Sequence, residues 1–527
     1  MMDAATLFAG QSLFAGQSLF AGQSLFAGQS LSGVIPAEVA GVSRDSRLTR
    51  PGEVYIATGP SADQPAHARQ AMANGASAVV AESGLVLDHA FPLLRTSHAR
   101  WSFARASAAA HHLPRAMLPL VAVTGTAGKS TTTHCAWWAM GAGAARIGTI
   151  GWHDGVTERP NPQTTPPPEQ LHDFLAGLPT NCSGVAMEVS SHAGDQHRLA
   201  GLPLAGLVFT GLGHDHLDYH RTSGAYLTAK LRAVRLLKYN GLCIINADSS
   251  DAHAVAHAAS GADARVVMLG FKRGDSRLVR VAGGWRLRHE AVDYRVPMRL
   301  PGDFNAWNAA AGALLATATG VPLITALERL ASMPTVPGRL ELLAQHPDTY
   351  VDFAHTPEEL SVMLGAVRKE FPGRRLVCVF GCGGDRDRSK RGPMGCAALM
   401  ADHAVLTTDN SRSEDPKTIA DEIIAGLPTG TPVFWANSED LDSGRWLQEI
   451  RPAYGARSDR VNDAPRSVLV ELDRGAAIRL ARALAGDDGV VVVAGKGHET
   501  DQLIGGKTLP WDDRAFVRQL GMLGKTP

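Results

Sequence analysis

A short apolar run that leads into a glycine-rich turn constrains the fold of this chain more than any other feature. Residues 120–123 read Leu-Val-Ala-Val, and Thr-Gly-Thr-Ala-Gly-Lys-Ser-Thr follows at 124–131. The apolar run is typical of a buried strand, and the glycines permit a tight turn into a helix. The pattern predicts an α/β domain built from parallel strands that alternate with helices.

The same turn carries groups that bind phosphate in nucleotide-binding loops. Gly125 and Gly128 let backbone N–H groups approach phosphate oxygens, and Lys129 supplies positive charge. Ser130 or Thr131 is suited to contact Mg²⁺. The spacing between the glycines is shorter than in the commonest loop of this kind, so an ordinary strand-to-helix turn stays as the alternative. We predict that the turn binds nucleotide phosphates.

Composition excludes several other classes of protein. The chain has 51 Lys and Arg against 51 Asp and Glu, which argues against a nucleic-acid-binding protein. Its six cysteines form neither a zinc-binding pattern nor a disulfide framework. Arg44 is the first basic residue, so the charged start of a secretory signal is missing, and no apolar run is long enough to span a membrane. We expect a cytoplasmic protein that binds no nucleic acid.

With 527 residues the chain exceeds what one hydrophobic core usually serves, and we expect three domains. A hexamer, Leu-Phe-Ala-Gly-Gln-Ser, is repeated near the N-terminus; we interpret it as a low-complexity expansion, with an interaction tail as the alternative. Proline-containing stretches at 112–119 and 334–338 indicate domain boundaries. The predicted segments are the repeat at 1–31 and domains at 32–116, 117–337 and 338–527.

The last predicted domain has apolar runs at Leu376–Phe380, His403–Thr407 and Gly489–Val493, separated by helical stretches. This alternation is expected of a doubly wound, Rossmann-like sheet. The polar stretch 440–465 is interpreted as an insertion.

Two polar clusters in the central domain follow apolar runs. Glu188 ends one run, and His214-Asp-His-Leu-Asp-Tyr-His220 leads into a helix that contains Lys230. Carboxylate and imidazole groups of this kind fit a phosphate-bound metal site. Taken singly, a polar turn and a solvated helix lysine explain these residues as well.

Six motifs in one order resemble those of the Mur ligases, most closely the members that add the third residue of the peptidoglycan stem peptide. They lie at 124–130, 187–192, 215–220, 352–357, 381–387 and 495–499. The resemblance runs from about Val42 to the C-terminus, apart from the insertion. It implies the α/β, three-domain Mur ligase architecture: an N-terminal domain for the UDP-substrate, a central P-loop ATPase domain and a C-terminal Rossmann-like domain that receives the amino acid.

The resemblance also implies an activity. Such an enzyme would be an ATP-dependent ligase that adds meso-2,6-diaminopimelate to UDP-N-acetylmuramoyl-L-alanyl-D-glutamate, through an acyl phosphate and with Mg²⁺. The alternatives are the same ligation with L-lysine or another diamine, a sister ligase that adds D-Ala-D-Ala, and a non-catalytic paralogue that binds nucleotide or UDP-sugar. We expect a monomer.

Carried over by motif, the resemblance implies five groups of site residues. The catalytic group would be Lys129, Glu188, His216 and Lys230. The metal ligands would be Ser130, Glu188, His216 and Lys230, the last as a carbamate (N6-carboxylysine). ATP would contact Gly125, Thr126, Gly128, Lys129, Ser130, Thr131, Asn305, Arg339 and Asp352. The UDP-substrate would contact Ser46, Thr164, Thr165, Ser190, Gln196 and Arg198. The amino acid would contact Arg386, Asp409, Asn410, Arg412, Gly495 and Glu499.

Arg412 carries the expectation about the amino acid. It ends the sequence Asp409-Asn-Ser-Arg412, where diaminopimelate-adding members have Asp-Asn-Pro-Arg. A guanidinium pairs bidentately with a carboxylate, so Arg412 would select the distal carboxylate of diaminopimelate, which lysine lacks. Ser411 replaces the proline and is expected to loosen the loop. The alternative is a surface arginine paired with Glu414 or Asp415.

Overall fold

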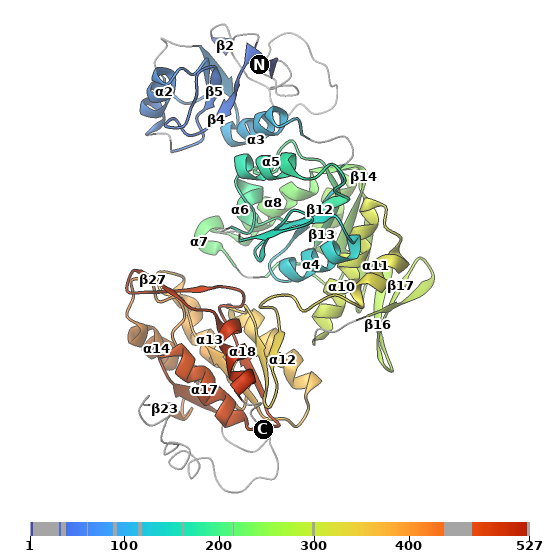
Figure 1. Ribbon diagram of the computed structural model, residues 1–527, viewed down its shortest axis with the longest axis vertical. Coiled ribbons are helices and arrows are strands. Elements are labelled where there is room, and N and C mark those ends of the chain that lie inside the picture. The colour runs from blue at the N-terminus through green and yellow to red at the C-terminus, as the bar shows by residue number, and fades with distance from the viewer. Residues whose placement is uncertain are drawn as a thin grey trace. The chain divides into compact units, whose positions relative to one another are not determined.

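The computed structural model describes residues 2–3, 31–32, 38–60, 62–87, 92–113, 118–160, 163–213, 215–297, 301–436 and 466–523. The hexamer repeat and the 440–465 insertion lie outside the described residues. The chain forms two compact units (Figure 1). The first comprises 1–280, 286–295 and 310–330, and the second comprises 281–285, 296–309 and 331–527. No helix among the described residues is long and apolar enough to cross a membrane.

The first unit begins with a small α/β module. Its five-stranded sheet has the order β2-β7-β6-β5-β4, and β4 to β7 run parallel. Alternate residues of each strand face opposite sides, so Val54 and Ile56 pack with Phe103, while Tyr55 packs with Ala68. The elements are β2 (Leu31–Ser32), β4 (Gly41–Ser43), β5 (Glu53–Ile56), α2 (Gln64–Ala73), β6 (Ala78–Glu82), β7 (Leu93–Thr96) and α3 (Ala99–Ala110), beside a separate pair, β1 (Met2–Asp3) and β3 (Glu38–Val39).

An eleven-stranded sheet follows, in the order β11-β10-β9-β12-β8-β13-β14-β15-β16-β17-β18. Its strands are β8 (Leu120–Thr124), β9 (Ala144–Gly148), β10 (Gly151–His153), β11 (Glu158–Arg159), β12 (Gly184–Glu188), β13 (Leu204–Phe209), β14 (Leu237–Asn246), β15 (Arg265–Gly270), β16 (Ser276–Val281), β17 (Gly284–His289) and β18 (Val292–Val296). β8 lies between β12 and β13 and is parallel to both, so the residues after these three strands meet at one edge.

Helices cover both faces of this sheet. One face packs against α5, α8 and α9, through residues such as Leu171, Ala233 and Val255. α4 follows β8, and Gly312 of α10 lies against Cys135 of α4. The helices are α4 (Lys129–Met140), α5 (Pro168–Gly177), α6 (Ser191–Asp195), α7 (Leu217–His220), α8 (Ser223–Val234), α9 (Ala252–Ser260), α10 (Asp303–Ala316), η1 (Thr317–Thr319) and α11 (Leu323–Leu330).

The second unit holds a seven-stranded sheet of order β19-β20-β25-β21-β22-β24-β23, parallel except for the β19–β20 pair. Its strands are β19 (Glu341–Ala344), β20 (Asp348–Val351), β21 (Leu376–Phe380), β22 (His403–Leu406), β23 (Val433–Trp435), β24 (Ser467–Val470) and β25 (Val490–Val493), with a hairpin of β26 (Asp501–Ile504) and β27 (Lys507–Pro510). The three strands predicted in this region are confirmed.

Helices cover both faces of this second sheet as well. One apolar cluster joins the sheet to α12 (Pro357–Glu370), α13 (Arg391–Ala398) and α14 (Pro416–Ala425), and another joins it to α17 (Arg474–Ala485) and α18 (Asp513–Leu523). A short 3₁₀ helix, η2 (Arg388–Lys390), precedes α13. The predicted doubly wound α/β fold is therefore confirmed.

Candidate active site

The predicted phosphate loop joins the end of β8 to the start of α4. Gly125 has φ +141° and Gly128 has φ +83°, values that side chains disfavour. A Cβ on Gly125 would lie 1.9 Å from Thr210 Oγ1 at the end of the neighbouring strand β13. The loop therefore requires glycine at 125 because a tertiary neighbour fills the space beside it.

Two lysine ammonium groups converge on this loop. Lys129 Nζ donates to the carbonyl oxygens of Gly125 (3.1 Å) and Thr126 (2.6 Å), and Lys230 Nζ donates to the same Gly125 oxygen at 2.6 Å. Lys230 is only 1% exposed, and desolvation lowers its pKa well below the ordinary value; the charge of Lys129 adds to this and Asp215 opposes it. Within the described ranges, neither lysine forms an ion pair. The loop thus brings two basic side chains together where phosphate would bind, and burial disfavours the charged form of Lys230.

Glu188 ends β12 beside the loop and is buried. Its Oε2 accepts a hydrogen bond from Ser130 Oγ at 3.0 Å, and its Oε1 accepts one from the backbone N–H of Thr149 at 2.8 Å. Thr149 Oγ1 also lies 3.1 Å from Glu188 Oε2 and 3.0 Å from Thr164 Oγ1. The structure therefore brings two of the predicted metal ligands, Ser130 and Glu188, into direct contact.

His216 belongs to a cluster of rings between α6, α7 and α8. Its ring centroid lies 5.0 Å from that of His192, and partial desolvation lowers its pKa to about 4, with help from Lys129 and Lys230. Tyr226 joins this cluster to the loop, because its hydroxyl lies 3.1 Å from Thr126 Oγ1 and Lys230 Nζ lies 4.4 Å from its ring centroid. His214 is outside the described residues.

In the described part of the chain, no three His, Cys, Asp or Glu side chains are grouped so that they could hold a metal ion. The predicted ligand set contains only two residues of these types, Glu188 and His216. Its completion depends on the hydroxyl of Ser130 and on a carbamate at Lys230, so the set remains a prediction.

Five of the residues predicted to contact the UDP-substrate lie near the end of β12. Thr165 Oγ1 donates to Glu188 O (2.8 Å) and accepts from the N–H of Ser190 (3.0 Å). Arg198 donates to Thr165 O and, through Nε and Nη2, to Gln196 Oε1 at 3.1 and 2.9 Å. Thr164 is linked to the Glu188 carboxylate through the hydroxyl group of Thr149.

The sixth residue, Ser46, lies in the N-terminal module. Its hydroxyl donates to Gln70 Oε1 of α2 at 2.7 Å. No described contact joins it to the other five, and its role stays a prediction.

In the second unit, Arg339 and Asp352 occupy adjoining turns. Asp352 follows β20, is partly buried, and accepts hydrogen bonds from the N–H groups of Leu340 (2.7 Å) and Ala354 (2.8 Å); desolvation raises the pKa of its carboxyl group. The guanidinium of Arg339 lies 4.4 Å from the ring centroid of Phe353. Asn305 Nδ2 donates to Pro301 O at the start of α10. These contacts order the predicted nucleotide residues of this unit.

Asn410 and Glu499, predicted to contact the amino acid, meet at the ends of β22 and β25. Asn410 Nδ2 donates to Glu499 Oε2 at 3.0 Å. A Cβ on Gly495, which has φ +111°, would lie 3.1 Å from Asp409 Oδ2, so Gly495 and Asp409 are also neighbours. Four of the six predicted amino-acid residues therefore form one group.

Arg412 lies next to this group. Its Nη1 donates to the carbonyl oxygens of Gly384 (2.8 Å) and Asn410 (3.3 Å), while its N–H donates to Leu503 O (2.9 Å). A Cβ on Gly383 would lie 2.9 Å from Arg412 Nη1 and 3.8 Å from Arg386 Cγ, so both arginines flank this glycine.

Glu414 does not pair with Arg412, contrary to the alternative interpretation. Its carboxylate binds Arg388 (2.8 Å) and Arg391 (2.9 Å) and accepts the N–H of Asp385 (2.6 Å). Among the described residues, no carboxylate pairs with Arg412. Arg388 of η2 and Arg391 of α13 form ion pairs with Glu414 instead. The spacing of these residues in the sequence does not indicate this pairing.

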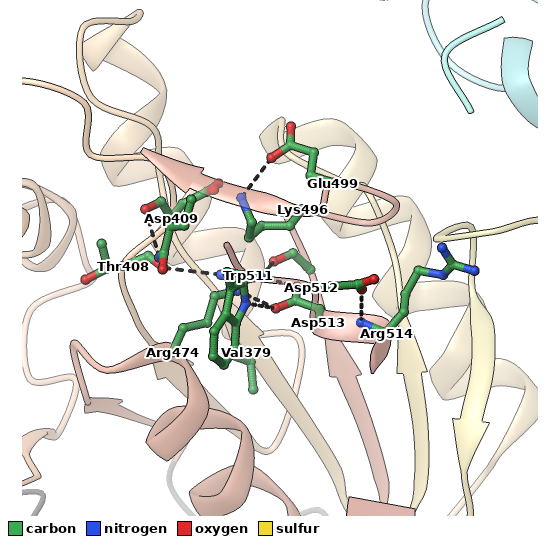
Figure 2. A network of polar contacts seen from close by, with 12 residues as sticks. Val379, Thr408, Asp409, Arg474, Lys496, Glu499, Trp511, Asp512, Asp513 and Arg514 are labelled. Carbon is green, nitrogen blue, oxygen red and sulfur yellow. Dashed lines mark hydrogen bonds and ion pairs between the residues drawn. The ribbon is translucent and has the colours of Figure 1, made fainter. Parts of the chain in front are cut away.

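Three charged residues of this region were not singled out from the sequence. Lys496 contacts both Asn410 and Glu499, and Arg474 pairs with Asp513; Figure 2 shows the Lys496–Glu499 and Arg474–Asp513 contacts. Lys496 lies within the Gly-Lys-Gly-His-Glu motif, which was the available signal. Arg474 and Asp513 are 39 residues apart and carry no comparable pattern.

One unit has a phosphate-type loop after a parallel strand of its mixed sheet, and the other has a charged site at the strand ends of a doubly wound sheet. These features define a nucleotide-binding α/β protein. Comparison with known proteins supplies the family. Residues 123–316 match the Mur ligase middle domain, and residues 338–497 match the Mur ligase glutamate ligase domain. The chain belongs to the Mur ligase family.

Similar proteins span nearly the whole chain. A protein of Rhizobium meliloti, named UDP-N-acetylmuramoyl-L-alanyl-D-glutamate--2,6-diaminopimelate ligase, is 37% identical over 92% of this chain and 94% of its own. A protein of the same name from Agrobacterium fabrum is 36% identical over 93% of this chain and 94% of its own. A solved structure of a ligase of this name is 27% identical, with a TM-score of 0.63, and covers 93% of this chain and 96% of its own.

Proposed function

We propose that this protein is an ATP-dependent ligase of peptidoglycan biosynthesis that joins meso-2,6-diaminopimelate to UDP-N-acetylmuramoyl-L-alanyl-D-glutamate. Relatives at 36 to 37% identity carry this activity in their names. The observation that carries the proposal is the position of Arg412, whose guanidinium has no carboxylate partner in the described residues and lies beside Asn410, which contacts Glu499. One cation and one carboxylate in one site match the distal zwitterion of diaminopimelate.

ATP would bind at the β8–α4 loop. Backbone N–H groups of the loop and of the α4 N-terminus, apart from that of Thr126, which donates to Gly211 O, would donate hydrogen bonds to its phosphate oxygens, and Lys129 would turn from the loop carbonyls to these oxygens. Transfer of the γ-phosphoryl group from ATP to the terminal carboxylate of the UDP-substrate would break the bond to the β-phosphate oxygen and give an acyl phosphate and ADP. The amine of the incoming amino acid would then attack the carbonyl carbon, and phosphate would leave.

The residues beside the loop fit Mg²⁺. The buried hydroxyl and carboxylate of Ser130 and Glu188, 3.0 Å apart, are hard oxygen donors of the kind that Mg²⁺ prefers. His216 and a carbamate at Lys230 would complete the set. When bound, the ion would neutralise charge on the transferring phosphate.

The surroundings of Lys230 support carbamylation. Two ammonium groups that share the Gly125 carbonyl repel each other, and burial of Lys230 disfavours its charged form. A neutral amine is nucleophilic: its nitrogen would bond to the carbon of CO₂ and release one proton, leaving an anionic carbamate. That group would attract Lys129 and supply oxygen ligands.

We place the reaction in the cytoplasm, where ATP is available. None of the six cysteines, all of which lie in described parts of the chain, forms a disulfide, which is compatible with a reducing compartment.

Product analysis tests the proposed function. Purified protein would be incubated with ATP, Mg²⁺, the UDP-dipeptide and an equimolar mixture of diaminopimelate and L-lysine, and the product would be weighed by mass spectrometry. We expect a product heavier by one diaminopimelate residue. Addition of lysine would contradict the proposed specificity, and absence of any ATP-dependent product would favour a nucleotide-binding paralogue.

A further inference from the structure

Lys496 has the most restricted environment of the lysines near the amino-acid site. Lys496 is the third residue after β25, which ends at Val493, and its side chain is 0% exposed. Its ammonium group donates to Glu499 Oε2 at 2.8 Å (Figure 2) and to Asn410 Oδ1 at 3.0 Å. Since the side chain is fully enclosed, it cannot reach a substrate itself.

The two partners of Lys496 also bind each other. Asn410 Nδ2 donates to Glu499 Oε2, so Lys496, Asn410 and Glu499 form a closed triangle of hydrogen bonds. The triangle fixes the side-chain amide of Asn410, since Oδ1 faces the lysine and Nδ2 faces the carboxylate. The amide also accepts the N–H of Leu503 at 3.0 Å, which ties it to β26.

The triangle leaves one carboxylate oxygen available. Lys496 and Asn410 both use Glu499 Oε2, whereas Oε1 has no hydrogen-bond partner among the described residues, and the Glu499 side chain is 31% exposed. Asn410 also links the triangle to the arginine, because its carbonyl oxygen accepts from Arg412 Nη1. The buried ammonium group of Lys496 thus orients the Glu499 carboxylate directly, and it orients the loop that carries Arg412 through Asn410.

We propose that Lys496 is a positioning residue for the incoming amino acid: it holds Glu499 so that Oε1 accepts the distal ammonium, and holds Asn410 so that Arg412 faces the distal carboxylate. This inference rests on the proposed function. A buried charge is costly unless it is paired, and stability alone is a weak reason to keep one. Orientation of Asn410 and Glu499 explains why a buried lysine is present at position 496.

Steady-state kinetics of three variants test the inference. Lys496→Met removes the ammonium but keeps a similar length, and Lys496→Gln keeps polar groups without the charge. Lys417→Met is the control, because Lys417 is an exposed lysine that pairs with Asp421 on α14. We expect both Lys496 variants to raise the KM for diaminopimelate about tenfold or more, since a small misplacement of binding groups has large effects. The KM values for ATP and UDP-dipeptide should change less than about twofold, and the control should match wild type.

A double-mutant cycle separates positioning from general damage. If Lys496 acts through Glu499, then Lys496→Met should add much less to the KM in a Glu499→Gln background than in wild type. Additive effects, an unchanged KM for diaminopimelate, a loss of kcat alone, or equal rises in all three KM values would each overturn the inference. Loss of a cooperative thermal transition in both Lys496 variants would assign the residue a purely structural role and overturn it too. A wild-type protein that forms no diaminopimelate product would instead refute the proposed function.

Discussion

Arg474 and Asp513 form a bidentate ion pair that is closed off from solvent. Arg474 Nε and Nη2 donate to Asp513 Oδ1 and Oδ2 at 2.8 and 2.7 Å, and the side chains are 1% and 0% exposed (Figure 2). Arg474 Nη2 also donates to Ala494 O at 2.9 Å. The pair therefore joins the start of α17 to the start of α18 and to the strand end that precedes Gly495.

Removing one member of this pair should destabilise the second unit. Asp513→Asn leaves the Arg474 charge buried without its counter-ion, which costs about 3 to 5 kcal/mol in comparable pairs. The midpoint of urea unfolding should fall accordingly. Asp487→Asn, at an exposed position in the same unit, serves as the control and should unfold like wild type. A midpoint for Asp513→Asn equal to that of the control would show that the pair contributes little.

Replacing Lys230 by alanine should nearly abolish ligation, because the variant lacks both the amine and any carbamate formed on it. Short-chain carboxylic acids added to the assay should restore part of the activity by supplying the missing oxygen ligand. Circular dichroism would confirm that the variant folds. Lys238→Ala, which removes an exposed lysine of β14, is the matched control. Full activity of Lys230→Ala without added acid would contradict a catalytic role for Lys230 and for a carbamate formed on it.

Arg412→Ala should raise the KM for diaminopimelate strongly. Loss of a charge pair in an enclosed site costs roughly 2 to 5 kcal/mol, while the constants for ATP and UDP-dipeptide should hardly change. Arg388→Ala is a useful comparison, because Arg388 is a nearby exposed arginine that pairs with Glu414. Equal losses with diaminopimelate and lysine would argue against selection of the distal carboxylate by Arg412.

Proline at position 411 should be neutral or mildly favourable. In the described part of the chain the N–H of Ser411 donates no hydrogen bond, so proline removes none, and it restores the Asp-Asn-Pro-Arg motif that the resemblance implies for diaminopimelate-adding members. Comparison of Ser411→Pro with wild type in the same kinetic assay checks this. A large rise in the KM for diaminopimelate would mean that the loop needs a conformation that proline forbids.

His172 should make the first unit sensitive to acid. Its Nδ1 lies 2.9 Å from Ser107 Oγ, and burial lowers its pKa to about 3, against an ordinary value of 6.5. Between these values the unfolded chain binds a proton that the folded chain does not, so stability falls as the pH falls from about 6.5 towards 3, by up to about 1.4 kcal/mol per pH unit. His172→Gln should reduce this slope in urea unfolding from pH 7 to 5, while His134 and His197, whose pKa values burial also lowers, keep the remainder. The exposed control His253→Gln should keep it, and an equal slope in all three proteins would contradict the prediction.

Local sequence patterns identified the elements whose structure depends on neighbours in the chain. The apolar run at 120–123 became a buried strand, and the glycine turn led directly into α4. Three apolar runs of the second unit became β21, β22 and β25. Strand burial and turn geometry are set within a few residues, so these features can be read from the sequence.

Contacts between distant residues depended on the tertiary structure. The convergence of Lys129 and Lys230 on one carbonyl joins residues about a hundred positions apart, and Arg474 and Asp513 meet only because α17 and α18 begin at the same edge of the sheet. Proximity in sequence does not predict the ion-pair partner of Glu414. Arg412 is only two residues away, yet Arg391 forms the ion pair. The sequence determined which chemical groups were available and in which local elements, whereas the packing of strands and helices decided which charges are paired, which are buried, and which remain for a substrate.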